Sequence, residues 1–384
     1  MKTHARLTCS NDSMFTMRMI LPVLTLLLTA FSVSCSHWEL NRSLWADQIC
    51  NRQTDPAVAV SETDTPNDDF KIAFVTNQQA SFWNIAAIGC QDAAEDFGVQ
   101  VDVRFPGEAT ATQQKQVVED LLSRKINALA ISPIDAANQV DMINDWASKI
   151  PVITHDSDAP ETDRLLYIGV DNYAAGRTVG KLIKQAYPDG CKLILTIGRI
   201  EQDNAQKRVQ GVIDELLDRP VDFQWRNETG RIQGNQYTIL TTLLDQGAIQ
   251  VAKQKVEDAI NAHPDVELFV GLFVYNPPAI LQALRQANKL GRIKVAAFDE
   301  DDMTLQGIKD GHVIGTVVQN PYEYGYQSVR VLHEILKGNR QVIPSNKYID
   351  IPARAVTIDG RQVYGESTEK LEDFWADLKD KLGD

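Results

Sequence analysis

The chain has 384 residues, a hydrophobic fraction of 43% and a formal net charge of −14, because 52 Asp and Glu residues outnumber 38 Lys and Arg residues. This length predicts about two domains, at roughly 100–200 residues each. The acidic balance argues against nucleic acid as a partner, because a nucleic-acid-binding protein needs a basic face.

The first 35 residues have the layout of a secretory signal. A positive charge at Arg18 precedes an apolar run from Ile20 to Phe31, and small residues lead up to Cys35. The run is shorter than the roughly 20 residues that a spanning helix needs. We therefore expect residues 1–35 to direct export to the periplasm. The sequence Ser-Val-Ser-Cys is similar to a bacterial lipoprotein box, so Cys35 is a candidate for lipid attachment, and release as a free periplasmic protein is the alternative.

The segment after the signal is polar and has no periodicity. We expect residues 36–69 to be a flexible tether, so that the fold starts near Phe70. Beyond the signal segment, Cys50, Cys90 and Cys191 are far apart and have no metal-like spacing. We expect buried free thiols, although export also permits one disulfide.

From Phe70 onward, short apolar runs alternate with segments of helical periodicity. Repeated β–α units predict parallel sheets with helices on both faces, and strands buried on both faces read as continuous apolar runs. In the first half, the predicted strands are 72–75, 99–103, 127–132 and 151–154, and the predicted helices are 84–97, 112–123 and 136–148.

The same alternation starts again after residue 171. The predicted strands are 192–198, 221–225, 266–272, 293–298 and 313–318, and the predicted helices are 172–186, 204–217, 248–262, 277–288, 302–310 and 322–337. A last amphipathic segment, 367–382, is expected to be a helix packed on the second unit, with a partner-docking helix as the alternative. The sequence thus predicts an α/β fold of two similar units.

Polar side chains follow the predicted strands. In open α/β sheets, ligands bind beyond the carboxyl ends of the strands. Sugar hydroxyls donate and accept hydrogen bonds, so they pair well with Asp, Asn, Gln and Arg. The pattern therefore favours a neutral sugar or a related polyol. The candidates at strand ends are Thr76, Asn77, Gln78, Gln79, Ser132, Asp156, Asp158, Asn204, Arg208, Tyr275, Asn276, Phe298, Asp299, Glu300 and Gln319.

Two adjacent aromatic residues, Phe82 and Trp83, follow the polar stretch after the first strand. The C–H faces of a sugar ring are apolar and pack well on an aromatic ring. We interpret the pair as a stacking platform or a wall at the mouth of a cleft. The alternative is that one of the two rings closes the end of the next helix against the core.

The order and spacing of several stretches resemble the periplasmic sugar-binding proteins of the ribose-binding type, which serve ABC importers. The resemblance covers residues from about 70 to 360. The stretches that carry it include KIAFVTNQQASFW, ALAISPIDA, IPVITHDSDA, YIGVDNYAAGRTVGKLI, NAQKRVQGV, KVAAFDE and GIKDGHVIGTVVQNPYEYGYQSV.

This resemblance implies two Rossmann-like lobes, with parallel sheets flanked by helices and three crossovers between the lobes. The crossovers would fall near 169–171, 319–321 and 348–352. The N-terminal lobe would then comprise residues 70–170 plus 320–348. The C-terminal lobe would comprise residues 171–319 plus 349–384.

The resemblance also implies which residues contact the ligand. Two departures from ribose-binding members keep ribose itself from being carried over: Ser157 stands where they have Arg, and Ala80 stands where they have Asn. The implied ligand contacts are Thr76, Phe82, Trp83, Ser132, Asp156, Arg208, Asn276, Phe298, Asp299 and Gln319.

The function implied is capture of a monosaccharide or polyol by hinge closure, followed by delivery to the permease of an ABC importer. Neither a cofactor nor a metal is expected. A sensory protein that presents its sugar to a chemoreceptor or histidine kinase is the alternative.

Two other classes of protein are disfavoured. Asp156, Asp299 and Glu300 could form a carboxylate pair for glycoside hydrolysis, but no nucleophile motif, Walker loop or H-E-x-x-H accompanies them. We therefore expect no enzyme. Repressors with the same two-lobe fold need an N-terminal helix-turn-helix, and here an export signal takes that place.

Overall fold

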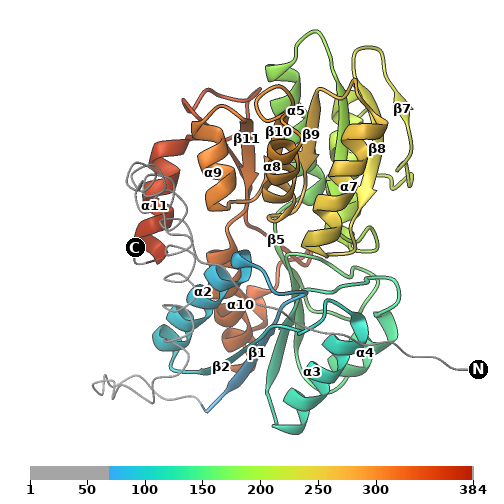
Figure 1. Cartoon of the computed structure of the whole chain (residues 1–384). Coiled ribbons are helices and arrows are strands. Elements are labelled where there is room, and N and C mark those ends of the chain that lie inside the picture. Colours follow the sequence, from blue (N-terminus) through green and yellow to red (C-terminus); the bar gives the residue numbers. More distant parts are fainter. Residues whose placement is uncertain (1–68, 383–384) are drawn as a thin grey trace, which may run out of the picture. The chain divides into compact units, whose positions relative to one another are not determined.

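Two β-sheets, each flanked by helices, organise the chain (Figure 1). The structure is a computed structural model that describes residues 69–382. The predicted signal and the predicted tether up to residue 68, with Cys35 and Cys50, lie outside the described residues. Cys90 and Cys191 are buried free thiols. Among the described helices, none combines the length and the apolar character needed to cross a membrane.

The first sheet has six strands in the order β12-β5-β4-β3-β1-β2, and all its pairs are parallel. The strands are β1 (Lys71–Val75), β2 (Gln100–Arg104), β3 (Ala128–Ile131), β4 (Val152–His155), β5 (Tyr167–Gly169) and β12 (Tyr348–Asp350). The helices packed with this sheet are α2 (Ser81–Phe97), α3 (Ala111–Ser123), α4 (Val140–Ala147) and α10 (Pro321–Leu336), and the short η1 (Arg340–Val342) contacts α10. We call these elements the first lobe.

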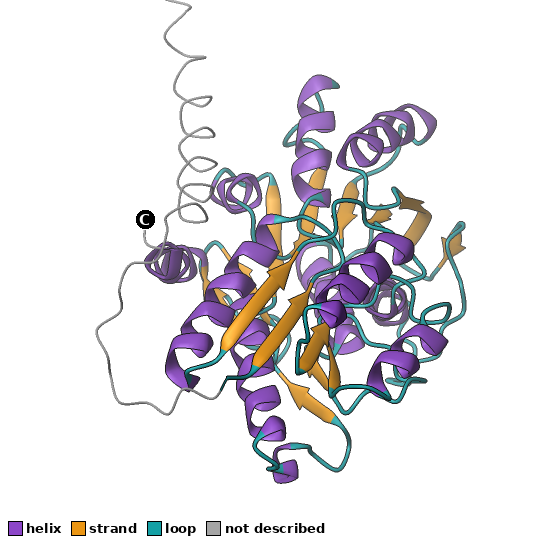
Figure 2. Ribbon diagram, turned by 90° about the horizontal axis from the view of Figure 1, so that it is seen from below, coloured by secondary structure: helices purple, strands orange, loops and turns teal. Residues whose placement is uncertain are grey.

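Strand β1 shows why helices cover both faces of this sheet. Ile72 and Phe74 belong to one apolar cluster, whereas Ala73 and Val75 belong to the cluster that contains Trp146 of α4. All four β1 side chains are completely buried. Alternate residues of a strand point to opposite faces, so both faces of the sheet must be covered. Figure 2 shows the helices on both sides of the strands.

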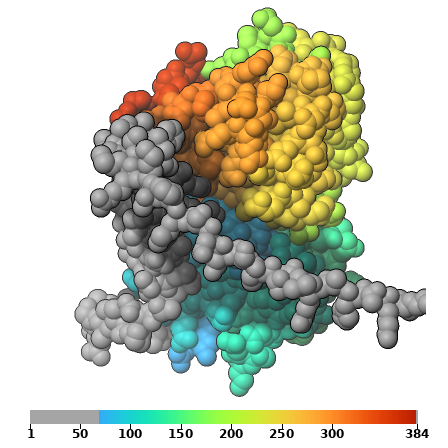
Figure 3. All heavy atoms as spheres, viewed as in Figure 1, coloured from blue at the N-terminus to red at the C-terminus, as the bar shows by residue number. Residues whose placement is uncertain are grey.

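The second sheet has eight strands in the order β14-β13-β11-β10-β9-β6-β8-β7. The strands are β6 (Lys192–Ile197), β7 (Ile232–Gln233), β8 (Thr238–Leu244), β9 (Leu268–Gly271), β10 (Lys294–Phe298), β11 (Val313–Val318), β13 (Arg354–Thr357) and β14 (Thr368–Lys370). The helices of this second lobe are α5 (Asn172–Ala186), α6 (Asp203–Leu216), α7 (Ile249–Ala262), α8 (Asn276–Gln286), α9 (Asp302–Lys309) and α11 (Leu371–Leu382). Figure 3 shows the yellow and orange surface of the second lobe above the blue and teal surface of the first.

The chain passes between the lobes three times. It leaves the first sheet between β5 and α5, returns between β11 and α10, and leaves again between β12 and β13. Helix α10 therefore lies beside α2, far from it in sequence but in the same lobe (Figure 1). The predicted fold class of two α/β lobes joined by three crossovers is confirmed.

Several predicted elements need correction. Residues 221–225 form no strand. The strand that lies beside β6 is instead β8, whose sequence TILTTLL mixes Thr with Ile and Leu and was not predicted. The predicted helix 136–148 is shorter and spans Val140–Ala147. The C-terminal helix begins at Leu371, because the preceding residues form β14. The second sheet is mixed, since β13 is antiparallel to β11 and β7 is antiparallel to β8.

Candidate ligand-binding site

A pocket lies where the carboxyl ends of strands from both sheets meet. It contains about 310 Å³ of space free of protein atoms, part of it open to solvent. Both lobes contribute to its wall, which fits the rule that ligands bind beyond the carboxyl ends of parallel strands. The lining residues are Asn77, Gln78, Ala80, Phe82, Trp83, Asp156, Asn204, Arg208, Phe273, Val274, Asp299 and Gln319.

The aromatic pair lies in the first turn of α2, because this helix begins at Ser81, three residues before the predicted start. Phe82 and Trp83 are 5% and 2% exposed, and their rings meet edge to face at 4.9 Å. Trp83 donates a hydrogen bond from Nε1 to Oδ1 of Asn77 at 3.2 Å. The two rings therefore line the pocket and also close the helix end against the core. A place in the pocket wall and a place in the core are thus compatible for this pair.

The Asp156 carboxylate is held by donors from both lobes. Its Oδ2 accepts hydrogen bonds from Nδ2 of Asn77 at 3.3 Å, from the Ser132 hydroxyl at 3.0 Å and from Nδ2 of Asn204 at 3.2 Å. Its Oδ1 lies 3.7 Å from Nη2 of Arg208. Asp156 follows β4 and has a φ of 58°, so the chain turns sharply where this carboxylate enters the pocket. Burial raises the pKa of Asp156, whereas Arg208 and the three donors lower it.

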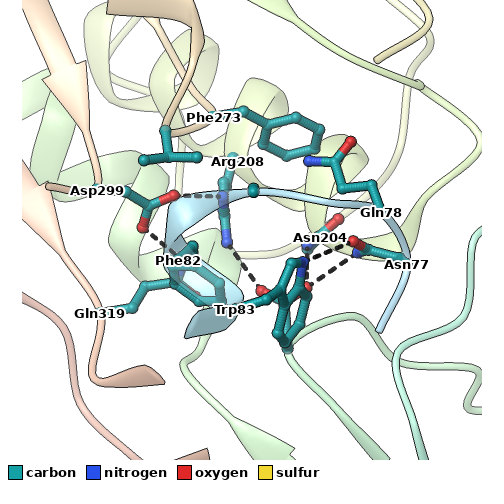
Figure 4. Close-up of a pocket in the computed structure, with 12 residues that line it drawn as sticks. Asn77, Gln78, Phe82, Trp83, Asn204, Arg208, Phe273, Asp299 and Gln319 are labelled. Carbon is teal, nitrogen blue, oxygen red and sulfur yellow. Dashed lines mark hydrogen bonds and ion pairs between the residues drawn. The ribbon is translucent and has the colours of Figure 1, made fainter. Parts of the chain in front are cut away.

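Arg208 projects from α6 into the centre of the pocket, with Asp299 and Gln319 on one side and Asn77 and Asn204 on the other (Figure 4). Its side chain is 1% exposed. Nε donates to Oδ1 of Asn172 at 2.8 Å, and Nη1 donates to the Leu272 carbonyl at 3.1 Å. These two contacts fix the plane of the guanidinium group.

The Phe298 ring lies under this guanidinium group, 4.0 Å from its central carbon. Such a cation–π contact stabilises a buried cation. Phe298 therefore touches the arginine rather than lining the pocket.

Asp299 supplies the second carboxylate, directly after β10, and its φ is 64°. Its Oδ1 accepts a hydrogen bond from Nε2 of Gln319 at 2.7 Å, and Oε1 of Gln319 accepts one from the Tyr324 hydroxyl at 2.9 Å. Its Oδ2 lies 3.9 Å from Nη1 of Arg208. Burial raises the pKa of Asp299 to about 6, although Arg208 and Gln319 favour its charged form.

Two buried polar atoms of the pocket have no hydrogen-bond partner: Nη2 of Arg208, a donor, and Oδ1 of Asn204, an acceptor. Leaving such atoms buried and unpaired costs roughly 1–3 kcal/mol each. Groups that both donate and accept, such as hydroxyls, satisfy both kinds of atom.

Six of the ten predicted contact residues line the pocket, and the other four lie behind it. Thr76 donates its hydroxyl to the Gln78 carbonyl, and Ser132 supports Asp156. Asn276 accepts a hydrogen bond from the Phe273 amide and donates one to Oδ2 of Asp245, so its amide group is already occupied. The six in the lining are Phe82, Trp83, Asp156, Arg208, Asp299 and Gln319.

Six of the lining residues were not among the ten predicted ligand contacts. Asn204 precedes Arg208 by one helical turn on α6, and this spacing places both side chains on one face. Asn77, Gln78 and Asn204 were candidates at strand ends, but the resemblance did not imply a ligand contact for them. The six residues are Asn77, Gln78, Ala80, Asn204, Phe273 and Val274. Within residues 69–382, no group of three or more His, Cys, Asp or Glu is arranged to hold a metal ion.

The chain is similar to known binding proteins along most of its length. Ribose import binding protein RbsB of Salmonella typhimurium is 27% identical over 301 residues, which cover 74% of this chain and 91% of the relative. The xylose/arabinose-binding protein XylF of Sulfolobus acidocaldarius is 25% identical over 316 residues, which cover 77% of this chain and 73% of the relative.

Solved structures give the same result. An ABC transporter solute-binding protein from Burkholderia graminis, in complex with D-arabinose, matches with a TM-score of 0.68 and 26% identity. The match covers 79% of this chain and 99% of that one. These relatives are substrate-binding proteins and not enzymes, and they confirm the resemblance indicated by the sequence motifs.

A sequence profile of the periplasmic binding protein domain matches residues 72–340. Because the match covers most of the chain, the protein belongs to the periplasmic binding protein domain family.

Proposed function

We propose that this protein is a periplasmic substrate-binding protein that captures a monosaccharide or related polyol between its lobes and delivers it to an ABC-type sugar importer. The observation that carries the proposal is the buried guanidinium group of Arg208, which lies between the carboxylates of Asp156 and Asp299 and has no hydrogen bond at Nη2. A hydroxyl or ring oxygen would complete this arrangement. Relatives named for ribose, xylose and arabinose binding support a sugar as the ligand.

Each pocket residue has a role in this proposal. Arg208 donates to sugar oxygens, and Asp156 and Asp299 accept from hydroxyls, which makes charge-assisted hydrogen bonds in a site shielded from water. Phe82 and Trp83 cover an apolar face of the ring.

The four predicted residues behind the pocket support the residues that line it. Ser132 and Phe298 orient Asp156 and Arg208, whereas Thr76 and Asn276 hold the loops that carry lining residues.

Capture requires the lobes to open and close about the three crossovers. Residues 70–170 plus 320–348 would move as one lobe, and residues 171–319 plus 349–384 as the other. The closed form would then be presented to a membrane permease. Export to the periplasm, and attachment through a lipid on Cys35, belong to the same proposal.

Thermal unfolding of the purified protein tests the ligand class. The panel is D-ribose, D-arabinose, D-xylose, D-allose, D-galactose, D-glucosamine and myo-inositol. A ligand at 100 times its dissociation constant stabilises the folded state by about 2.7 kcal/mol, which shifts the midpoint clearly. We expect a shift with at least one compound and its loss in Asp299→Asn. A folded protein with a flat response to the whole panel would refute the sugar proposal.

A further inference from the structure

A buried asparagine at the first crossover touches both lobes. Asn172 is the first residue of α5, directly after the chain leaves the first sheet, and it is 2% exposed. It does not line the pocket. Its side chain nevertheless contacts two residues that do, Asp156 and Arg208.

The two ends of the Asn172 amide group face different lobes. Oδ1 accepts the hydrogen bond from Nε of Arg208 at 2.8 Å, within the second lobe. Nδ2 lies within hydrogen-bond distance of the Asp156 carbonyl and of the Tyr167 hydroxyl, at 3.2 Å each, and of the Val170 carbonyl at 3.4 Å. The acceptor end thus fixes the arginine, and the donor end reaches the first lobe.

The hydroxyl of Tyr167 reinforces the first-lobe side of this contact. It lies 2.9 Å from the Asp156 carbonyl and 3.1 Å from the Val170 carbonyl. The Tyr167 hydroxyl and the Asn172 amide group at the crossover therefore both hold the backbone carbonyl of Asp156. A rotation of the second lobe that carries Asn172 away from Asp156 also carries Arg208 away, because α5 and α6 pack together.

We propose that Asn172 is a positioning residue that couples lobe closure to the orientation of Arg208. In the closed form, its donor end holds the first lobe while its acceptor end holds the guanidinium group in the plane that leaves Nη2 for the ligand. This inference rests on the proposed function for its ligand but not for its effect on the lobes.

Asn172→Asp tests the coupling, because the variant keeps an acceptor for Arg208 and removes the donor toward the first lobe. Asn320→Asp is the matched control. Asn320 also begins a helix at a crossover, but its side chain caps α10 by accepting from the Glu323 amide, and aspartate preserves that contact. Tyr167→Phe provides a second variant, because it removes only the hydroxyl group.

The first readout is the radius of gyration of the ligand-free proteins by small-angle X-ray scattering. We expect the radius of gyration of Asn172→Asp, and to a smaller extent that of Tyr167→Phe, to exceed the wild-type value. The radius of Asn320→Asp should equal the wild-type value. The second readout is the affinity for D-ribose and for D-arabinose by calorimetry. We expect Asn172→Asp to weaken binding about tenfold, the effect of one lost hydrogen bond of ordinary strength.

Equal radii and equal affinities for Asn172→Asp and Asn320→Asp would overturn the inference. If the wild type binds neither sugar, the scattering comparison still decides it. A larger radius of gyration for Asn172→Asp, together with a wild type that binds neither sugar, would uphold the coupling and count against the sugar proposal alone. Unchanged scattering in both Asn172→Asp and Tyr167→Phe would reject the coupling whatever the sugar does.

Discussion

Asn204 of α6 donates a hydrogen bond from Nδ2 to Oδ2 of Asp156 at 3.2 Å and thereby joins the two lobes across the pocket. The Oδ1 of the same amide is buried without a hydrogen-bond partner, and Asn204 lines the pocket. One side chain therefore both closes the pocket and leaves an acceptor for a ligand. This arrangement connects closure of the lobes directly to ligand binding.

Replacing Asn204 should weaken binding without weakening the fold. Asn204→Ala removes the contact between the lobes and the free acceptor, and the loss of one or two hydrogen bonds predicts roughly ten- to a hundredfold lower affinity by calorimetry. Alanine favours helices, so the unfolding midpoint without ligand should not fall. Asn261→Ala is the control, because this exposed side chain donates only to the Glu257 carbonyl within α7. Equal affinity in both variants would show that Asn204 has no part in the site.

Anionic sugars should bind far more weakly than neutral ones. Arg208 already faces the carboxylates of Asp156 and Asp299, so the pocket has no cation left to pair with a phosphate. Like charges placed together at an interface cost several kcal/mol. D-Ribose 5-phosphate should therefore give no thermal shift at concentrations where a neutral sugar of the panel gives a clear one. A larger shift with the phosphate would mean that the carboxylates do not set the charge preference.

Acid should destabilise the protein through His155. This side chain is fully buried, with its ring stacked on Phe74 at 3.9 Å, and burial lowers its pKa to about 3. Between pH 6.5 and pH 3 the unfolded chain binds the extra proton, so stability falls as the pH falls through this window.

His155→Phe keeps an aromatic ring at this position and removes the titrating group. Denaturant unfolding at pH 7 and pH 5 should show the wild type losing about 2 kcal/mol more than the variant between these conditions. The comparison cancels the groups that titrate in the opposite sense, such as Glu300, whose pKa is raised by burial to about 8. The same pH dependence in both proteins would place the titration elsewhere.

Because α2 and α10 pack closely at Gly89, replacing this glycine with alanine should destabilise the protein. A Cβ added at Gly89 would lie 2.1 Å from the Tyr322 carbonyl oxygen, and one added at Gly325 would lie 2.0 Å from the Ala86 carbonyl oxygen. Alanine normally stabilises a helix relative to glycine, but the forced separation of the helices should destabilise the protein by about 1–3 kcal/mol. Gly107→Ala is the control, because nothing lies within 4 Å of its added Cβ. Chemical unfolding that ranked Gly89→Ala as the more stable variant would contradict this packing.

The sequence predicted the helices and most of the buried parallel strands, because their apolar runs and helical periods are strong, but it did not predict the three-residue strand β5. It missed β8, in which three Thr residues interrupt the apolar run, and it placed a strand at 221–225, where the chain forms a loop. A strand such as β8 depends on pairing with a distant strand, here β6, and local sequence does not record that pairing.

The residues of the site were also predicted only in part. The resemblance led to the charged groups of the pocket, Asp156, Arg208 and Asp299. It could not show that Asn276 is already paired with Asp245, nor that Asn204 takes a place in the lining. Hydrogen-bond partners from distant segments decide which amide stays free for a ligand, and only the folded chain brings these segments together.

A crystal structure of the protein, grown with the sugar that gives the largest thermal shift, tests the central claim most directly. We expect the sugar ring to lie between the aromatic pair Phe82 and Trp83 and the guanidinium group of Arg208. A ligand oxygen should lie within hydrogen-bond distance of Nη2 of Arg208, and hydroxyls should lie against the Asp156 and Asp299 carboxylates. A sugar bound elsewhere, or one that makes no hydrogen bond to Nη2, would contradict this role of the pocket.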